Sequence, residues 1–149
     1  MRAKKYWIVC ISKEHAAFAF KGGIIQACHG KEWPLRQMQK DDEIVIYSSK
    51  EEMGDTKSVL QAFTAIGRVA DNEIYQYAMS EDFIPFRRKV EYYECEEASI
   101  LPLISSLRFI PNKKFWGYPF RYGIVEIGVK DFELICGEMR CKRERFDIS

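Results

Sequence analysis

The chain has no long apolar run, no excess of either charge and no low-complexity linker. No uninterrupted apolar stretch approaches the roughly 18 residues that indicate a transmembrane helix. Its 23 Lys and Arg nearly balance 22 Asp and Glu, so whole-molecule attraction to polyanions is excluded as the main driver of binding. Because no internal repeat or Gly/Ser-rich linker divides the sequence, residues 1–149 are expected to form one continuous domain.

Several catalytic signatures are also missing. The sequence contains no phosphate-binding loop, no dinucleotide glycine fingerprint, no GxSxG elbow and no HExxH helix. Cys28 and His29 are adjacent, but neighbours on an extended segment point to opposite faces, so His29 is not expected to activate that thiol. His15 is expected to be a solvated helix residue. We therefore predict no catalytic residue and no cofactor.

Cysteine is scarce, and no two cysteines form a CxxC pair. The five cysteines indicate reduced thiols in a cytoplasmic protein. The apolar run that ends at Ile11 is too short for a secretory signal peptide, which points the same way. Cys136 and Cys141, with Cys28 or His29, are candidate metal ligands, yet structural zinc sites normally use two tight pairs. Buried free thiols and no metal are therefore expected.

What the chain does have is an ordinary globular composition that is rich in aromatic residues. Hydrophobic residues make up 47% and charged residues 30%, which suits a folded domain that needs no disulfide or metal. Aromatic residues reach 14%, which indicates either a core of large side chains or aromatic binding surfaces. We expect a monomer with no membrane partner.

Hydrophobic patterning predicts more strands than helices. Strands are expected at residues 6–12, 43–48, 59–70, 88–95 and 122–127; the second is expected to be half-buried, and Gly67 in the third marks a bulge or a close backbone approach. Helices are expected from Ser12 to Gly22-Gly23, from Pro34 through Met38, and at 100–107 and 129–139, with a frayed tail at 140–149. The expected fold class is α+β, a twisted, mostly antiparallel sheet or small barrel with short helices at its edges.

The segment 109–121 (FIPNKKFWGYPFR) mixes aromatic rings with cations on an irregular backbone. Its members are the cations Lys113, Lys114 and Arg121 and the aromatic residues Phe115, Trp116, Tyr118 and Phe120. Aromatic faces accept a base while cations bind the phosphates, so this mixture is typical of a nucleic-acid-binding loop. The alternative is that Trp116 and Phe120 plug one end of the core and that the cations are solvated.

Two further stretches carry polar groups suited to binding. The run Phe86-Arg87-Arg88-Lys89 is a basic cluster entering a strand, which a solvated edge strand explains equally well. The stretch 22–31 places Gln26, His29 and Lys31 between glycines on an expected loop. Polar donors on such a loop often line a pocket.

Taken in order, these segments resemble the EVE-domain family, a member of the PUA-like group that also includes the YTH and ASCH domains. The resemblance runs from about Lys5 to Met139 and is strongest over 100–123, which contains PLI, FI, a Lys pair and WGYPFR. The other matching pieces are His29-Gly30-Lys31, Tyr47-Ser48, residues 60–69 and Arg87-Arg88 with Val90.

The chain also departs from the family pattern at three places. Asp41-Asp42 stands where the family often has Gly-Asp, and Ser48-Ser49 stands where it has Ser-Pro. Gln26 occupies the place where many EVE and YTH relatives carry a tryptophan. The resemblance therefore does not extend to an aromatic cage for a methyl group.

The resemblance implies a PUA-like sheet of five or six strands, barrel-like and flanked by helices, with a cavity suited to a flipped nucleobase. We therefore predict a non-enzymatic module that binds DNA or RNA and recognises a modified or extruded base. The pocket residues are then Gln26, His29, Lys31, Tyr47, Trp116, Tyr118, Phe120 and Arg121, and the phosphate-binding cations are Arg87, Arg88, Lys113 and Lys114. A small-molecule-binding or hydrolytic protein with Cys28 or His29 as its reactive group, and a scaffold with the aromatic segment as its interface, are the alternatives.

Overall fold

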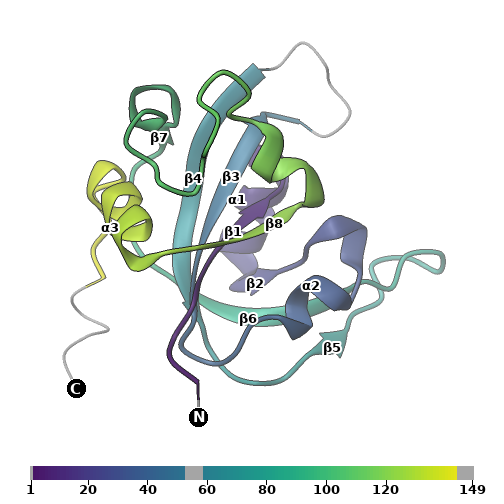
Figure 1. The fold of residues 1–149 in the computed structure, drawn as a ribbon. Coiled ribbons are helices and arrows are strands. Elements are labelled where there is room, and N and C mark those ends of the chain that lie inside the picture. The colour runs from purple at the N-terminus through teal and green to yellow at the C-terminus, as the bar shows by residue number, and fades with distance from the viewer. Residues whose placement is uncertain (1, 53–58, 144–149) are drawn as a thin grey trace.

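A computed structural model describes residues 2–52 and 59–143, which form a curled sheet flanked by short helices (Figure 1). The strands are β1 (Tyr6–Cys10), β2 (Ile24–Ile25), β3 (Glu43–Lys50), β4 (Val59–Val69), β5 (Tyr75–Gln76), β6 (Phe86–Tyr92), β7 (Ala98–Ser99) and β8 (Ile124–Ile127). The helices are α1 (Lys13–Gly22), α2 (Trp33–Arg36) and α3 (Val129–Glu138), with single 3₁₀ turns η1 (Cys28–Gly30), η2 (Leu101–Leu103) and η3 (Tyr118–Tyr122). In the described part of the chain, no helix is long and apolar enough to cross a membrane.

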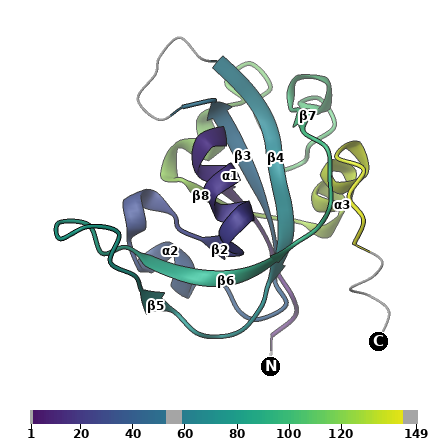
Figure 2. The same cartoon turned by 180° about the vertical axis from the view of Figure 1, so that it is seen from behind.

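The strands lie in the order β2-β6-β4-β3-β1-β8, with β5 added to β6 and β7 added to β4. All pairs are antiparallel except β1 with β3, which are parallel because the chain crosses over between them through α1 and α2. The long strands β3 and β4 form the spine of the sheet, and β6 curls away from them (Figure 2). The predicted α+β class and the mostly antiparallel, curled sheet are confirmed.

The sheet is covered on both faces, and each face has its own core. Ile8 of β1 packs into a cluster that includes Phe132 and Ile135 of α3, whereas Trp7 and Val9 point to the other face, where α1 packs. Strand β3 is therefore buried on both sides from Glu43 to Ser48, and the expectation that it would be half-buried is wrong. The alternation of apolar and polar residues along this strand predicts one buried face. It could not show that further elements pack on the other face and bury its residues too.

Local signals located several elements correctly. Ser12 accepts a hydrogen bond from the His15 N–H at 3.3 Å and caps α1, and Gly23 ends the helix with a left-handed φ of 65°. Gly67 allows a close approach, since a Cβ there would lie 2.5 Å from the carbonyl oxygen of Glu91. The helix expected at 129–139 is present as α3, and its apolar residues Phe132, Ile135 and Cys136 are buried.

Other boundaries differ from the prediction. Strand β6 begins at Phe86 and ends at Tyr92, two or three residues earlier than expected at each end. The helix expected at 100–107 is only the turn η2 followed by further turns. The last strand starts at Ile124 because the residues before it form η3, which ends at Gly123 with a φ of 82°.

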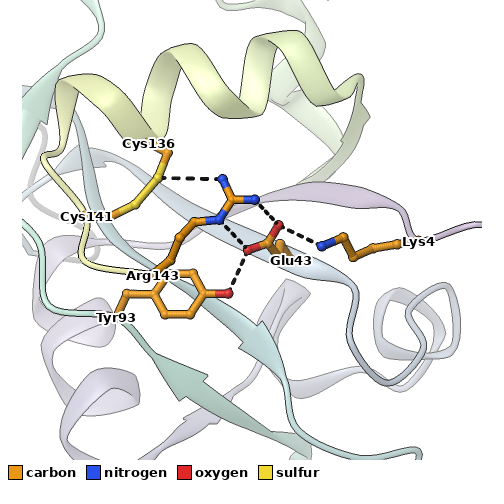
Figure 3. The surroundings of a disulfide bond; sticks show 6 residues. All are labelled: Lys4, Glu43, Tyr93, Cys136, Cys141 and Arg143. Carbon is orange, nitrogen blue, oxygen red and sulfur yellow. Dashed lines mark hydrogen bonds and ion pairs between the residues drawn. A yellow bond between two sulfur atoms is a disulfide. The ribbon is translucent and has the colours of Figure 1, made fainter. Parts of the chain in front are cut away.

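Helix α3 ends in a turn that brings Cys136 and Cys141 together in a disulfide (Figure 3). Arg140 adopts a left-handed φ of 50°, and the Cys141 N–H donates to the carbonyl oxygen of Cys136 at 3.2 Å. This Schellman turn places the two Cα atoms 5.5 Å apart, within bonding range. The prediction of reduced thiols is therefore wrong for Cys136 and Cys141. The disulfide leaves neither of these sulfur atoms available as a metal ligand. Cys10, Cys28 and Cys95 are free thiols.

After the disulfide, the chain is held on the sheet as far as Arg143, although a frayed tail was expected from residue 140. The Lys142 N–H donates to the carbonyl oxygen of Glu94 at 2.8 Å, and the Arg143 guanidinium lies 3.2 Å from the buried Glu43 carboxylate. Tyr93 donates its hydroxyl to the same carboxylate at 2.6 Å (Figure 3). The rest of the predicted frayed tail, 144–149, lies outside the described residues.

Candidate binding pocket

A large open pocket of about 1240 Å³ lies where β1 and β3 end, beside α1 and the segment 114–123. Its walls come from chain segments that are far apart in the sequence. The polar and charged lining residues are Ser12, Glu14, His15, Gln26, His29, Ser49, Lys50, Gln61, Lys114 and Arg121. The larger apolar and aromatic ones are Phe18, Tyr47, Met79, Phe83, Phe115, Trp116, Phe120 and Tyr122.

One wall of the pocket is a left-handed turn, not the extended segment expected at Cys28 and His29. Cys28, His29 and Gly30 all have positive φ, at 49°, 61° and 84°. Gly30 is required here because a Cβ would lie 2.4 Å from the Cβ of Pro85. Cys28 and His29 are two consecutive non-glycine residues with left-handed φ values, so they store backbone strain. Such strain concentrates at functional sites.

Some of the aromatic rings that line the pocket pack against one another, which leaves less of their surface for a ligand. Tyr47 is only 3% exposed, and its ring stacks on that of Phe120 with centroids 4.4 Å apart and planes 15° apart. Phe120 also meets Phe109 and Trp116 edge-on, at 5.6 Å and 6.5 Å. Tyr47 and Phe120 thus close the end of the core beneath the pocket, and Trp116 is the half-buried ring above them.

Arg121 lines the pocket between two exposed tyrosines. Its guanidinium carbon lies 3.5 Å from the ring centroid of Tyr118 and 4.3 Å from that of Tyr122. It also donates to the carbonyl oxygen of Tyr118 at 3.1 Å and to the Tyr122 hydroxyl at 3.0 Å. The cation is thereby held at the rim, while Tyr118 itself lies outside the pocket lining.

Of the four predicted phosphate-binding cations, Arg87, Arg88 and Lys113 do not line the pocket. Arg88 is 2% exposed and donates to the carbonyl oxygens of Leu35, Met38 and Asp71, so its predicted phosphate role is wrong. Its guanidinium thereby ties α2 and the turn after it to the loop after β4 inside the fold.

The other cations divide between the pocket and its surroundings. Arg87 is 6% exposed, which leaves it too little surface to reach a phosphate. The Lys113 ammonium donates to the carbonyl oxygen of Leu107 at 2.7 Å, and Lys31 is exposed outside the pocket lining. Lys114 does line the pocket, where Lys50 joins it.

Sequence reasoning missed the contribution of α1 and of the loop after β5. Glu14, His15 and Phe18 line the pocket from α1, and Met79 and Phe83 line it from the other side. A helical spacing of three and four residues relates Phe18 to His15 and Glu14, and this pattern could have shown that they share a face. Nothing local links Met79 and Phe83 to the pocket.

The free thiols at the pocket are poor nucleophiles. Burial, with a contribution from nearby Cys28, raises the pKa of Cys10 to about 12. Burial also raises the pKa of Cys28, although Lys31 acts in the opposite direction. Both thiols stay protonated at neutral pH. Across residues 2–52 and 59–143, no group of three or more His, Cys, Asp or Glu side chains is placed to hold a metal ion.

Solved structures of low sequence identity share this fold. A protein from Rhodopseudomonas palustris, Rpa0253, has 13% identity and a TM-score of 0.56, over 91% of this chain and 93% of its own. Protein Atu2648 from Agrobacterium tumefaciens has 12% identity and a TM-score of 0.54, over 89% of this chain and 91% of its own. At this identity the likeness concerns the fold alone, and it agrees with the predicted PUA-like architecture.

Sequence relatives are much closer. A UPF0310 protein in the gntR 5′ region of Bacillus licheniformis is 45% identical over 128 residues, 86% of each chain. A UPF0310 protein of Mycobacterium avium is 46% identical over 133 residues, 89% of this chain and 96% of its own. The sequence model of the EVE domain matches residues 5–138. This chain therefore belongs to the EVE domain family.

Proposed function

We propose that this protein is a nucleic-acid-binding module that holds one extruded or modified base in the pocket. The observation that carries the proposal is the composition of that pocket. Gln26 and His29 offer hydrogen-bonding groups, Trp116 offers an aromatic ring, and Lys50 and Lys114 bring positive charge into the same cleft. These are the three kinds of group that a base and its flanking phosphates require.

The size of the pocket supports a ligand larger than a single small molecule. Pockets for small ligands typically measure about 300–1,000 Å³. At about 1240 Å³ and open to solvent, this one has room for a base together with part of its backbone. We assign Arg121, which lines the same pocket, to a phosphate next to that base.

The alternative of a hydrolytic protein with Cys28 as its nucleophile has less support. The raised pKa of Cys28 keeps its sulfur protonated, and the sulfur lies 3.3 Å from the carbonyl oxygen of Tyr122, to which it donates. A thiol held in this way is not activated for attack. The proposed role is therefore binding without chemistry.

The proposal is tested by titrating fluorescent single-stranded oligonucleotides with wild-type protein and with Lys114→Ala. The variant should bind more weakly, whereas Lys89→Ala, which removes an exposed lysine of β6 outside the pocket, should bind as wild type. With two or three phosphate contacts, the log–log dependence of affinity on salt should have a slope of about −1.5 to −2.

Discrimination between bases is the second arm of this test. One suitable modified base in an otherwise identical oligonucleotide should tighten binding by about 1–3 kcal/mol. Gln26→Ala with His29→Ala should remove that difference and leave the unmodified oligonucleotide nearly unaffected. Equal loss of affinity in Lys114→Ala and Lys89→Ala, with no discrimination among bases, contradicts the proposal.

A further inference from the structure

The amide of Gln26 has its orientation decided by Arg87. The Arg87 Nε–H donates to Oε1 of Gln26 at 2.9 Å. A guanidinium has donors and no acceptor, so the amide atom that faces it must be the oxygen. Gln26 lines the pocket, and among the described residues no group accepts a hydrogen bond from its Nε2. The amide NH₂ is therefore the end left for a ligand.

Arg87 itself is held firmly, although no carboxylate within residues 2–52 and 59–143 forms an ion pair with it. It is 6% exposed, and its guanidinium carbon lies 4.2 Å from the ring centroid of Tyr77 and 5.9 Å from that of Phe18. Its Nη2 is buried and has no hydrogen-bond partner in the described part of the chain. Because no acid among the described residues pairs with this guanidinium, its charge polarises the Gln26 amide and strengthens the N–H groups of that amide as donors.

We propose that Arg87 is a positioning residue that makes Gln26 an obligate hydrogen-bond donor in the pocket. The site then takes a base whose inserted edge has a carbonyl oxygen at C4 of a pyrimidine or at C6 of a purine, as in uracil or hypoxanthine. The corresponding amino bases, cytosine and adenine, would set an NH₂ group against the NH₂ of Gln26. This inference rests on the proposed function and adds to it the polarity of the recognised edge.

The chemistry of the substitution Gln26→Glu gives the sharpest test. The carboxylate of the new side chain has acceptors and no donor, so it accepts hydrogen bonds from Arg87 and offers only its remaining lone pairs to the ligand. Wild type should bind an oligonucleotide with a central uracil or hypoxanthine about 5- to 150-fold more tightly than the matched cytosine or adenine oligonucleotide, the range of one good base contact. Gln26→Glu should reverse this preference.

Arg87 is tested by the same four oligonucleotides. Arg87→Leu frees the amide to turn, so the preference should shrink toward equality, and Arg87→Lys, which keeps a charged donor, should retain part of it. A purely structural role would lower the melting temperature and weaken all four affinities equally. Lys89→Ala, on the same strand, is the control and should leave the ratios unchanged.

The outcomes separate this inference from the proposed function. If oligonucleotides bind in a Lys114-dependent way but Gln26→Glu leaves the ratio of carbonyl to amino bases unchanged, the inference is overturned and the binding function stands. If none of the four oligonucleotides binds in a Lys114-dependent way, both are overturned. Reversal by Gln26→Glu supports both, even where Arg87→Leu fails to fold.

Discussion

The rings of Tyr47 and Phe120 stack nearly parallel, with centroids 4.4 Å apart. Tyr47 comes from the buried strand β3 and Phe120 from η3, so this contact joins the sheet to the aromatic segment. Burial, with a contribution from Cys10, raises the pKa of the Tyr47 hydroxyl far above its usual value. The pair forms a structural wall of the pocket, and the ring of Trp116 meets Phe120 edge-on at the same pocket.

Phe120 and Trp116 should therefore respond differently to truncation. Phe120→Ala should lower the free energy of unfolding by about 2–3 kcal/mol, somewhat less than a fully buried Phe would lose. Trp116→Ala should cost less stability but should weaken oligonucleotide binding by about 1–3 kcal/mol, the value of one stacked base. Urea unfolding and anisotropy titration measure the two effects. If Trp116→Ala unfolds readily while its folded fraction binds normally, Trp116 only plugs the core.

Arg88 should matter for stability and not for binding. Arg88→Met removes donors from the carbonyl oxygens of Leu35, Met38 and Asp71 and should cost about 2–4 kcal/mol of unfolding free energy. The folded variant should bind oligonucleotides within about twofold of wild type, as should Lys89→Ala. A large loss of affinity at unchanged stability would restore the phosphate-binding role.

Reduction of the Cys136–Cys141 disulfide should destabilise the protein modestly. The two residues are separated by 5 positions, and a loop this short gives at most about 2 kcal/mol of stabilisation in the chain-entropy view. Thermal unfolding with and without a phosphine reductant measures the difference. The double variant Cys136→Ser, Cys141→Ser is the control and should not respond to reductant. Thiol titration of the unfolded wild type should rise by two thiols per chain on reduction.

Asp42 should stabilise the protein at neutral pH and lose this effect in acid. Burial tends to raise its pKa, but hydrogen bonds from Arg2, the Lys5 N–H, the Trp7 indole and the Gln39 N–H prevail and lower it below its ordinary 3.8. A lowered pKa in the folded state means that the stabilisation is complete above about pH 4 and disappears as the pH falls through the folded-state value.

The measurement is urea unfolding of wild type and Asp42→Asn between pH 7 and pH 2.5. At pH 7 the variant should be less stable by about 1–3 kcal/mol, because one buried acceptor oxygen and its charge are lost. The gap should narrow below pH 4. A gap that stays constant down to pH 2.5 would show that the charge of Asp42 contributes nothing.

The sequence by itself determined the elements whose signals are local. Ser12 and Gly23 bound α1 because capping and left-handed φ depend on the residues at the helix ends, and the apolar stripe of α3 follows from helical spacing alone. The composition of the segment 109–121 suits no regular buried element, and its residues Lys114, Phe115, Trp116, Phe120 and Arg121 line the pocket, whereas Lys113 and Tyr118 do not.

Only the tertiary structure decided which polar groups are buried and what they contact. Arg87 and Arg88 are neighbours on one strand, yet alternation sends Arg88 to carbonyl groups of α2 and of the turn after it, and Arg87 to the amide of Gln26, 61 residues away. The pocket likewise joins α1, the turn at Cys28, the end of β3 and the segment 114–123. Such contacts depend on how the sheet curls and which strands become neighbours, and no pattern within a single segment carries that information.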